Sequence, residues 1–281
     1  MNCYLCNSTS FKTRKGRVRD AQDLKILECV ACGLVALSSA GHIQEGFYEK
    51  SGMHGEALVP IDIWLKETDG DDQRRFEILK VALANKKVLD FGCGAGGFLV
   101  KAQALAAHVA GIELEQRVQT HWAGRLTIHP DIVSAGVGYD IITAFHVVEH
   151  LPDPRNTLKS LAHLIANKGR IIIEVPSSED ALLTLFDCAA FQKFTYWSQH
   201  LFLFNAKTLQ QLARQAGLKV TAIQQYQRYP LSNHMYWLSQ GKSGGHKEWS
   251  FLDSPILAES YANSLAAIGK CDTLIAHLEL E

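Results

Sequence analysis

The sequence predicts an α/β protein: a doubly wound, Rossmann-like, mostly parallel seven-stranded sheet, preceded by a small N-terminal zinc ribbon. Three observations lead to this fold class. Apolar runs alternate with helical patterns between residues 87 and 175, a glycine-rich stretch follows the first of these runs, and two Cys-x2-Cys pairs lie in the first 37 residues. Alternation of strand and helix favours a parallel sheet covered by helices on both faces.

Composition limits the classes of protein to which the chain can belong. Its 281 residues, 47% of them hydrophobic, suffice for one large α/β domain and a small appendage. A net charge of −1 provides no global field for nucleic acid or an anionic membrane surface, so we expect neither as a partner. We find no apolar run of membrane-spanning length and no signal peptide, and we therefore expect a cytoplasmic protein without membrane insertion.

The first element, residues 1–37, is predicted to be a zinc ribbon. Four thiolates spaced as two knuckles can converge tetrahedrally on one Zn²⁺, and such a closed site is structural rather than catalytic. The predicted metal ligands are Cys3, Cys6, Cys29 and Cys32. Between the two pairs, basic residues alternate with small or apolar ones, which suits either a solvated face or a surface for phosphate groups. These cations are Lys12, Arg14, Lys15, Arg17 and Arg19.

After the ribbon we expect a linker with lead-in helices over residues 38–72 and the α/β core over residues 73–225. An aromatic-rich insertion near residues 186–204 is typical of core packing or of a lid over a ligand. Residues 226–281 mix aromatic and polar side chains and are assigned to a substrate-binding or partner segment. The predicted core strands cover residues 87–91, 108–112, 126–128, 139–144, 169–175 and 218–223.

The strongest local signal is the glycine-rich turn after the first core strand. Gly92, Gly94 and Gly96 let the backbone turn sharply and approach a ligand before the next helix begins. Glu113 ends the next apolar run about 20 residues later, where a ribose-binding carboxylate is expected. Together these residues predict a nucleoside site at the carboxyl ends of two adjacent strands.

The motifs resemble those of class I S-adenosylmethionine-dependent methyltransferases. The resemblance rests on residues 88–96 and 111–113, on 139–142 leading to 148–154, and on 169–176 and 200–204. It covers roughly residues 74–223. The double Cys-x2-Cys pattern is similar to that of bacterial deoxysugar C-methyltransferases, which are longer and carry an additional C-terminal domain.

The resemblance implies S-adenosylmethionine as cofactor. Asp90 is then expected to accept hydrogen bonds from the methionine ammonium, and Glu113 to bind both ribose hydroxyls. The alternatives are a turn-stabilising acid at Asp90 and a solvated strand-end acid at Glu113. Asp131 is a candidate for the adenine site and equally suits a turn. The full predicted cofactor-binding set is Asp90, Phe91, Gly92, Gly94, Gly96, Phe98, Glu113, Leu114 and His146.

Catalytic candidates follow the strand that ends near Ala144 and recur in the aromatic insertion. Imidazole titrates near neutral pH, so these groups suit removal of a proton from the methyl acceptor. Each also has a plain structural interpretation, as cofactor packing, loop structure or lid packing. The candidates are His146, Glu149, His150 and His200.

The predicted function is S-adenosylmethionine-dependent methyl transfer to a small hydroxylated metabolite, for example a sugar or nucleotide-sugar of a nucleotide-linked or surface-glycan pathway. One alternative is an RNA methyltransferase that uses the zinc ribbon to bind RNA. A second is a catalytically silent adaptor with the same fold. The sequence leaves open the acceptor's identity, whether carbon, oxygen or nitrogen is methylated, and the oligomeric state.

Overall fold

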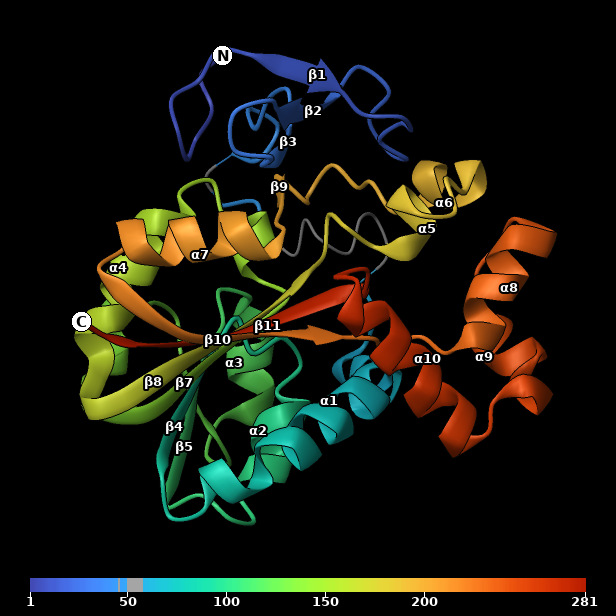
Figure 1. Cartoon of the computed structure of the whole chain (residues 1–281). Helices are drawn as coiled ribbons and strands as arrows, with labels where there is room; N and C mark the ends of the chain where they lie inside the picture. The colour runs from blue at the N-terminus through green and yellow to red at the C-terminus, as the bar shows by residue number, and fades with distance from the viewer. Residues whose placement is uncertain (45, 50–57) are drawn as a thin grey trace.

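A seven-stranded mixed sheet forms the centre of the protein, here described from a computed structural model that covers residues 1–44, 46–49 and 58–281. The strand order is β10-β11-β8-β7-β4-β5-β6 (Figure 1). Five adjacent strands are parallel, whereas β11 runs antiparallel to both of its neighbours. The strands are β4 (Lys87–Phe91), β5 (His108–Ile112), β6 (Thr127–His129), β7 (Tyr139–Phe145), β8 (Ile165–Pro176), β10 (Leu218–Tyr226) and β11 (Thr273–Leu280).

The sheet confirms the predicted fold class but corrects the C-terminal boundary. Residues 273–280, predicted to belong to a separate C-terminal segment, form β11 between β8 and β10. Leu274, Ala276 and Leu278 belong to the main core, because a strand inside a sheet has both edges paired and its side chains covered. Because aromatic-rich residues precede β11, the sequence pattern does not predict this short apolar strand.

Helices cover both faces of the sheet. Helices α1 (Ile61–Leu83), α2 (Gly97–Ala102) and α3 (Gln116–Trp122) share one hydrophobic core with one face. Helices α4 (Pro154–Leu164) and α7 (Ala206–Gln215) pack their leucines into the core on the other face. The single 23-residue helix α1 replaces the predicted boundary at residue 72, because the glycine at position 70 does not interrupt it.

Local signals explain where the helices of the second face begin. Asp153 caps α4 by accepting a hydrogen bond from the Asn156 amide, and Pro154 occupies the first turn, where no amide is needed. Asn205 and Thr208 form a reciprocal capping box at the start of α7. These caps place the chain segments that precede both helices at the carboxyl edge of the sheet.

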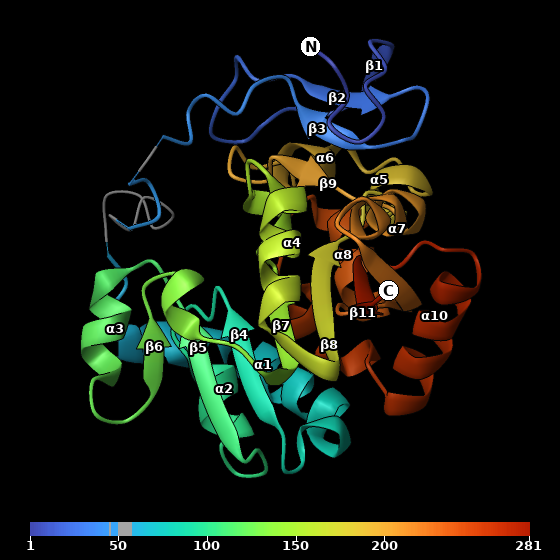
Figure 2. The same ribbon diagram turned by 90° about the vertical axis from the view of Figure 1, so that its left-hand side faces the viewer.

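The N-terminal ribbon is joined to the aromatic insertion by a second sheet. Strands β1 (Phe11–Thr13), β2 (Ile26–Cys29) and β3 (Val35–Leu37) pair antiparallel, and β9 (Phe202–Leu203) of the insertion adds to β3. Figures 1 and 2 both show the ribbon lying above the insertion, on the side of the sheet where the parallel strands end. The ribbon is therefore part of the wall above the sheet rather than a separate appendage.

Short helices complete this wall. The chain between β8 and β9 contributes α5 (Ala181–Thr184) and α6 (Ala189–Phe194), and the chain between β10 and β11 contributes α8 (Leu231–Gln240), α9 (Gly245–Glu248) and α10 (Pro255–Ala267). Single helical turns lie at Val133–Ala135, Val148–His150 and Ser250–Leu252. Across the described part of the chain, no helix combines the length and apolar character that crossing a membrane requires.

Candidate active site

At two positions of the glycine-rich turn, the backbone has a conformation that only glycine adopts without strain. Gly92 and Gly94 have φ angles of 68° and 53°, in the left-handed region. A Cβ atom on Gly92 would lie 2.5 Å from a methyl carbon of Val147. The turn thus brings the backbone after β4 close to the loop after β7, where the two strands end side by side.

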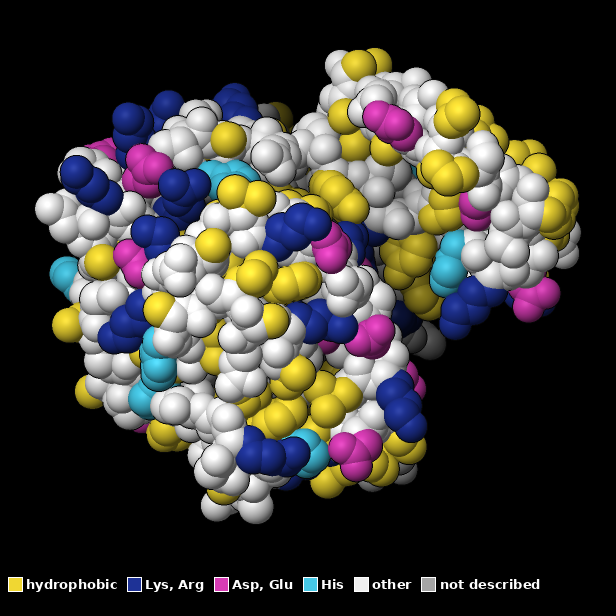
Figure 3. All heavy atoms as spheres, turned by 90° about the horizontal axis from the view of Figure 1, so that it is seen from below, with side chains coloured by type: hydrophobic (Ala, Val, Ile, Leu, Met, Phe, Trp, Pro, Cys, Tyr) yellow, Lys and Arg dark blue, Asp and Glu magenta, His cyan; other side chains and the backbone are white. Residues whose placement is uncertain are grey.

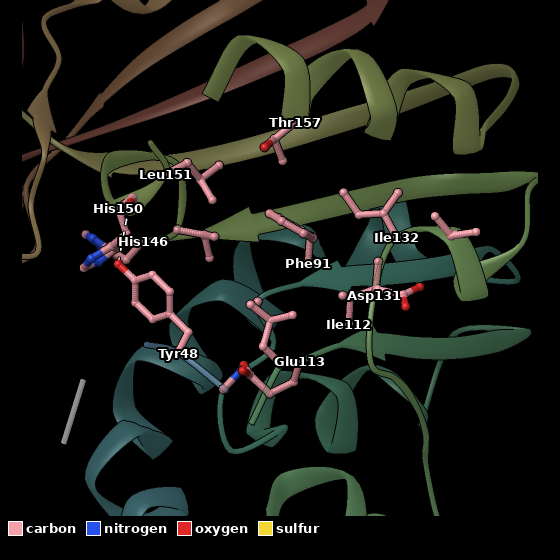
Figure 4. A pocket seen from close by; sticks show the side chains of 15 residues that line it. Tyr48, Phe91, Ile112, Glu113, Asp131, Ile132, His146, His150, Leu151 and Thr157 are labelled. Carbon is pink, nitrogen blue, oxygen red and sulfur yellow. Dashed lines mark hydrogen bonds between the residues drawn. The ribbon is translucent and has the colours of Figure 1, made fainter. Parts of the chain in front are cut away.

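A cavity of about 440 Å³ opens over this turn, as expected for a nucleoside-sized ligand (Figure 4). In this view Tyr48, His146 and His150 cluster on the left, Glu113 lies below the centre and Asp131 lies to the right. We call it the donor cavity. Its walls are Tyr48, Phe91, Gly92, Gly94, Ile112, Glu113, Leu114, Asp131, Ile132, Val133, His146, Val147, His150, Leu151 and Thr157.

Glu113 is held at the wall of the donor cavity by two backbone amides. Its Oε2 accepts a hydrogen bond of 2.9 Å from Gly94 N, and its Oε1 accepts one of 3.1 Å from Glu115 N. Burial raises the pKa of Glu113 to about 7, although the backbone amides of Gly94 and Leu114 favour the ionised form. Each oxygen has a further lone pair available to a hydroxyl group.

Three residues of the predicted cofactor set do not line this cavity. Asp90 is buried in the sheet, where its Oδ1 accepts a 2.7 Å hydrogen bond from Thr143, and burial raises its pKa to about 7. Gly96 is the N-cap residue that precedes α2, and Phe98 packs edge-on against Phe145 in the core with ring centroids 5.0 Å apart. The glycine spacing locates the turn but does not distinguish its ligand-facing side from its core-facing side.

His146 joins the donor cavity to the rest of the site. It has a φ of 54°, uncommon for a residue other than glycine and typical of functional turns. Its Nδ1 lies 3.0 Å from Glu149 Oε1, and its Nε2 lies 3.2 Å from Glu174 Oε1. Although burial opposes a positive charge, hydrogen bonds with these two carboxylates raise the pKa of His146.

Glu174, at the end of β8, is the centre of an ion-pair network that sequence patterning does not reveal. It accepts hydrogen bonds of 2.8 Å from Arg74 and 2.9 Å from Arg75, both on α1. Despite its burial, hydrogen bonds with His146 and Arg74 hold the pKa of Glu174 well below its usual range. Arg228, after β10, pairs with Asp71 and has Nη1 3.1 Å from His146 Nε2. No spacing rule connects residues so far apart in sequence.

Three predicted catalytic residues come together beside His146. One ligand atom from each of Glu149, His150 and His200 lies within 4.8 Å of the others. The imidazole rings of His150 and His200 have centroids 4.9 Å apart at an angle of 72°. Burial lowers the pKa of His150, and burial together with the neighbouring His150 lowers that of His200 to about 3. Two neutral imidazoles thus face one buried carboxylate.

A second cavity, of about 300 Å³, lies on the other side of this cluster and is called the acceptor cavity. His146 lines both cavities, whereas His150 lines only the donor cavity and His200 only the acceptor cavity. The remaining walls combine aromatic and polar side chains from the ribbon, the insertion and the segment after β10. They include Arg19, Asp180, Phe191, Phe194, Trp197, Arg228, Tyr229, Asn233, His234, Trp237, His246 and Asp272.

The four ribbon cysteines converge as a zinc site requires. Cys3 and Cys32 have Sγ atoms 3.5 Å apart, as do Cys6 and Cys29. All four sulfur atoms lie within 4.8 Å of one another. Tetrahedral Zn²⁺ holds thiolates at about 2.3 Å from the metal, so this cluster is compatible with one such ion.

Most of the basic residues between the cysteine pairs contact other parts of the chain. Lys12 pairs with Glu28 at 3.0 Å, and Arg14 donates to the Ser178 carbonyl at 2.9 Å. Arg19 lies over the Trp197 ring, 4.9 Å from its centroid. Figure 3 shows the side away from the ribbon, where basic and acidic side chains are interspersed among apolar ones. These contacts favour a role in docking the ribbon over its role as a phosphate-binding surface.

Comparison with known proteins agrees with this geometry. A family model described as a methyltransferase domain matches residues 72–223, which is more than half of the chain. A ubiquinone biosynthesis O-methyltransferase of Aeromonas salmonicida is 33% identical over 105 residues, covering 32% of this chain and 43% of that protein. The corresponding protein of Thiobacillus denitrificans is 29% identical over 157 residues, or 50% of this chain and 67% of that protein.

A solved structure supports the fold alone. It is a chain from the complex between the Haloferax volcanii Trm112 methyltransferase activator and a methyltransferase, with a TM-score of 0.51 and 14% identity. The match covers 79% of this chain and 98% of that chain. From its family match, the chain belongs to the methyltransferase domain family, and its sheet topology agrees with the class I fold that the sequence predicts.

Proposed function

We propose that the protein transfers the methyl group of S-adenosylmethionine to a hydroxyl group of a small, hydroxyl-rich ring compound, such as a free or nucleotide-linked sugar. The observation that carries this proposal is that the two cavities meet at one cluster of titratable side chains. His150 faces the donor cavity, His200 faces the acceptor cavity, and His146 lines both. A methyl donor and its acceptor need such a shared point of contact.

The residues of the donor cavity fit the cofactor. Gly92 and Gly94 leave room for close backbone approach, and the two oxygens of Glu113 suit a pair of ribose hydroxyls. Ile112, Leu114 and Ile132 supply apolar surface for a purine ring, with Asp131 as a candidate hydrogen-bond acceptor at its edge. Asp90 acts from behind the turn, as a positioning residue rather than as a direct ligand.

When bound, S-adenosylmethionine supplies an electrophilic methyl carbon, so that an O–C bond forms as the S–C bond breaks and its electron pair stays on sulfur. The protein's tasks are to align the acceptor and to remove its proton. His200 and His150 hold unprotonated nitrogens near the meeting point of the cavities and can accept that proton. Glu149 stabilises the positive charge that then develops on them.

The acceptor class follows from the chemistry of the acceptor cavity. Trp197, Phe191 and Trp237 offer ring faces for an apolar side of the acceptor, whereas Asn233 and Asp272 offer hydrogen-bonding groups. This combination suits a sugar ring, which has one apolar face and several hydroxyls. The relatives' name contains O-methyltransferase, which supports oxygen as the acceptor atom. It does not favour a sugar over another hydroxylated ring.

The proposal is tested by incubating the purified chain with methyl-labelled S-adenosylmethionine and three groups of acceptors. These are free and nucleotide-linked deoxysugars, catechols, and tRNA or rRNA fragments. We expect label transfer to a sugar, with loss of transfer in the His200→Ala variant. Transfer to catechols alone would replace the sugar with a phenolic acceptor, and transfer to RNA alone would overturn the proposal.

A further inference from the structure

Three side chains of the active-site cluster each have a buried polar atom that lacks a hydrogen-bond partner among the described residues. The atoms are Oε2 of Glu149, Nδ1 of His150 and Nδ1 of His200. The Glu149 side chain is fully buried, and His150 is 8% exposed. Leaving one buried polar group unpaired costs about 1–3 kcal/mol, so three such atoms on the side chains of one cluster point to a partner that the chain itself does not supply.

The arrangement has the chemistry of a metal site. A carboxylate and two imidazoles form the set of three protein ligands found where a catalytic Zn²⁺ keeps its fourth position open. One ligand atom from each of the three side chains lies within 4.8 Å of the others. Small side-chain rotations bring such atoms to the separation of about 3.4 Å that a tetrahedral ion with bonds of about 2.1 Å requires.

The surroundings resemble the outer shell of a metal site. His146 occupies Oε1 of Glu149 at 3.0 Å, which leaves Oε2 for an ion. Such partners orient metal-binding carboxylates and imidazoles. Trp197 and Tyr48 pack their rings edge-on against His150, with centroid distances of 5.9 and 6.5 Å. These contacts restrict the imidazole and reduce its access to water.

We propose that Glu149, His150 and His200 bind a divalent transition-metal ion of the Zn²⁺ type, whose open position takes the acceptor's hydroxyl oxygen. This inference rests on the proposed function and replaces its proton-accepting step: with the ion bound, His150 and His200 are ligands and no longer take up the acceptor's proton. The ion lies where the donor and acceptor cavities meet, because its imidazole ligands line opposite cavities. It lowers the pKa of the bound hydroxyl, whose proton is released to solvent as the oxygen becomes a nucleophile.

The ribbon provides an internal standard for the experiment. Its four cysteines account for one metal equivalent per chain, whereas the proposed site adds a second with only nitrogen and oxygen ligands. The full chain is loaded with Co²⁺, freed of unbound metal and analysed for metal content and absorption. Thiolate-bound Co²⁺ gives sulfur-to-metal charge-transfer bands, and the second ion adds only ligand-field bands.

We expect two equivalents in the wild-type chain and in His163→Ala, a matched control that removes an exposed imidazole from α4. His200→Ala and the near-isosteric Glu149→Gln should each retain one equivalent and keep the thiolate bands. One equivalent in all four proteins would overturn the inference. If His200→Ala does not fold, the wild-type stoichiometry and Glu149→Gln still decide the question.

Methyl transfer measured on the same samples separates this inference from the proposed function. If wild-type chain that holds only the ribbon ion methylates as fast as chain that holds two ions, the metal site is rejected and the proposed function stands. Failure of the two-ion chain to methylate any hydroxylated acceptor would reject the proposed function, while the stoichiometry continues to support the metal site.

Discussion

The donor and acceptor cavities are built in different ways. The donor cavity is formed mainly at the ends of β4, β5 and β7 and in the loops that follow them directly. The acceptor cavity draws on the ribbon, the aromatic insertion and the chain around β10 and α8. On the proposed function, the sheet provides a general donor site, and the peripheral segments determine which acceptor is used. Changes confined to one cavity should leave the other function intact.

The largest difference between donor binding and methyl transfer is expected when the ribbon loses its metal. Cys29→Ser, or removal of metal by a chelator, should unfold the ribbon, since structural zinc contributes about 10–16 kcal/mol of binding free energy in isolated fingers. The acceptor wall loses Arg19 and the pairing of β3 with β9, so methyl transfer should cease. Calorimetry should find S-adenosylmethionine binding within about 0.5 kcal/mol of wild type. Loss of S-adenosylmethionine binding together with methyl transfer would show that the donor and acceptor cavities are not independent.

Glu174 contacts His146, which lines both the donor and the acceptor cavity, so its replacement should affect both cavities. Glu174→Ala leaves Arg74 and Arg75 without their buried carboxylate and should lower the free energy of unfolding by about 3–5 kcal/mol. Chemical denaturation measures this change. Glu179→Ala, which removes a more exposed acid paired with Lys270, is the control and should cost less than about 1 kcal/mol. Equal losses in the two variants would contradict the central role of Glu174.

Glu113 should affect only the donor side. Glu113→Ala should weaken S-adenosylmethionine binding by about 1–3 kcal/mol, the cost of lost hydrogen bonds to a charged group. Asp90→Asn should change binding less, because the Asp90 side chain contacts Thr143 rather than the cavity. Equal effects on the dissociation constant would show that Asp90 is a direct ligand after all.

A smaller effect on the same side is a dependence of donor binding on pH. Glu113 has a pKa of about 7 because of its burial, so its carboxylate becomes protonated below neutrality. Binding that needs the ionised form should weaken as pH falls through about 7, by up to tenfold per pH unit. The folded state binds more protons than the unfolded state between about pH 4.5 and 7, so Glu113 makes the unliganded protein more stable as pH falls across this range. Binding that stays constant from pH 8 to pH 5.5 would exclude this role.

The same contrast explains what the sequence reveals. Glycines and an acid at strand ends are contiguous signals, so the sequence alone is enough to locate Gly92, Gly94 and Glu113. The cysteine pairs and the grouping of His146, Glu149 and His150 are equally local. His200 is a histidine in an aromatic segment, and only the folded chain brings it beside His150. Arg74, Glu174 and Arg228 meet from three distant elements, and β11 lies between strands that precede it in the chain, so no periodicity predicts either arrangement.

One comparison of variants tests the central claim, the separation of a donor site from an acceptor site, most directly. Dissociation constants for S-adenosylmethionine and turnover numbers are measured for Glu113→Ala and His200→Ala beside wild type. We predict that Glu113→Ala loses cofactor affinity, whereas His200→Ala binds the cofactor as wild type does and loses turnover by about 10²–10⁴-fold. Unchanged affinity in Glu113→Ala, or unchanged turnover in His200→Ala, would contradict the account.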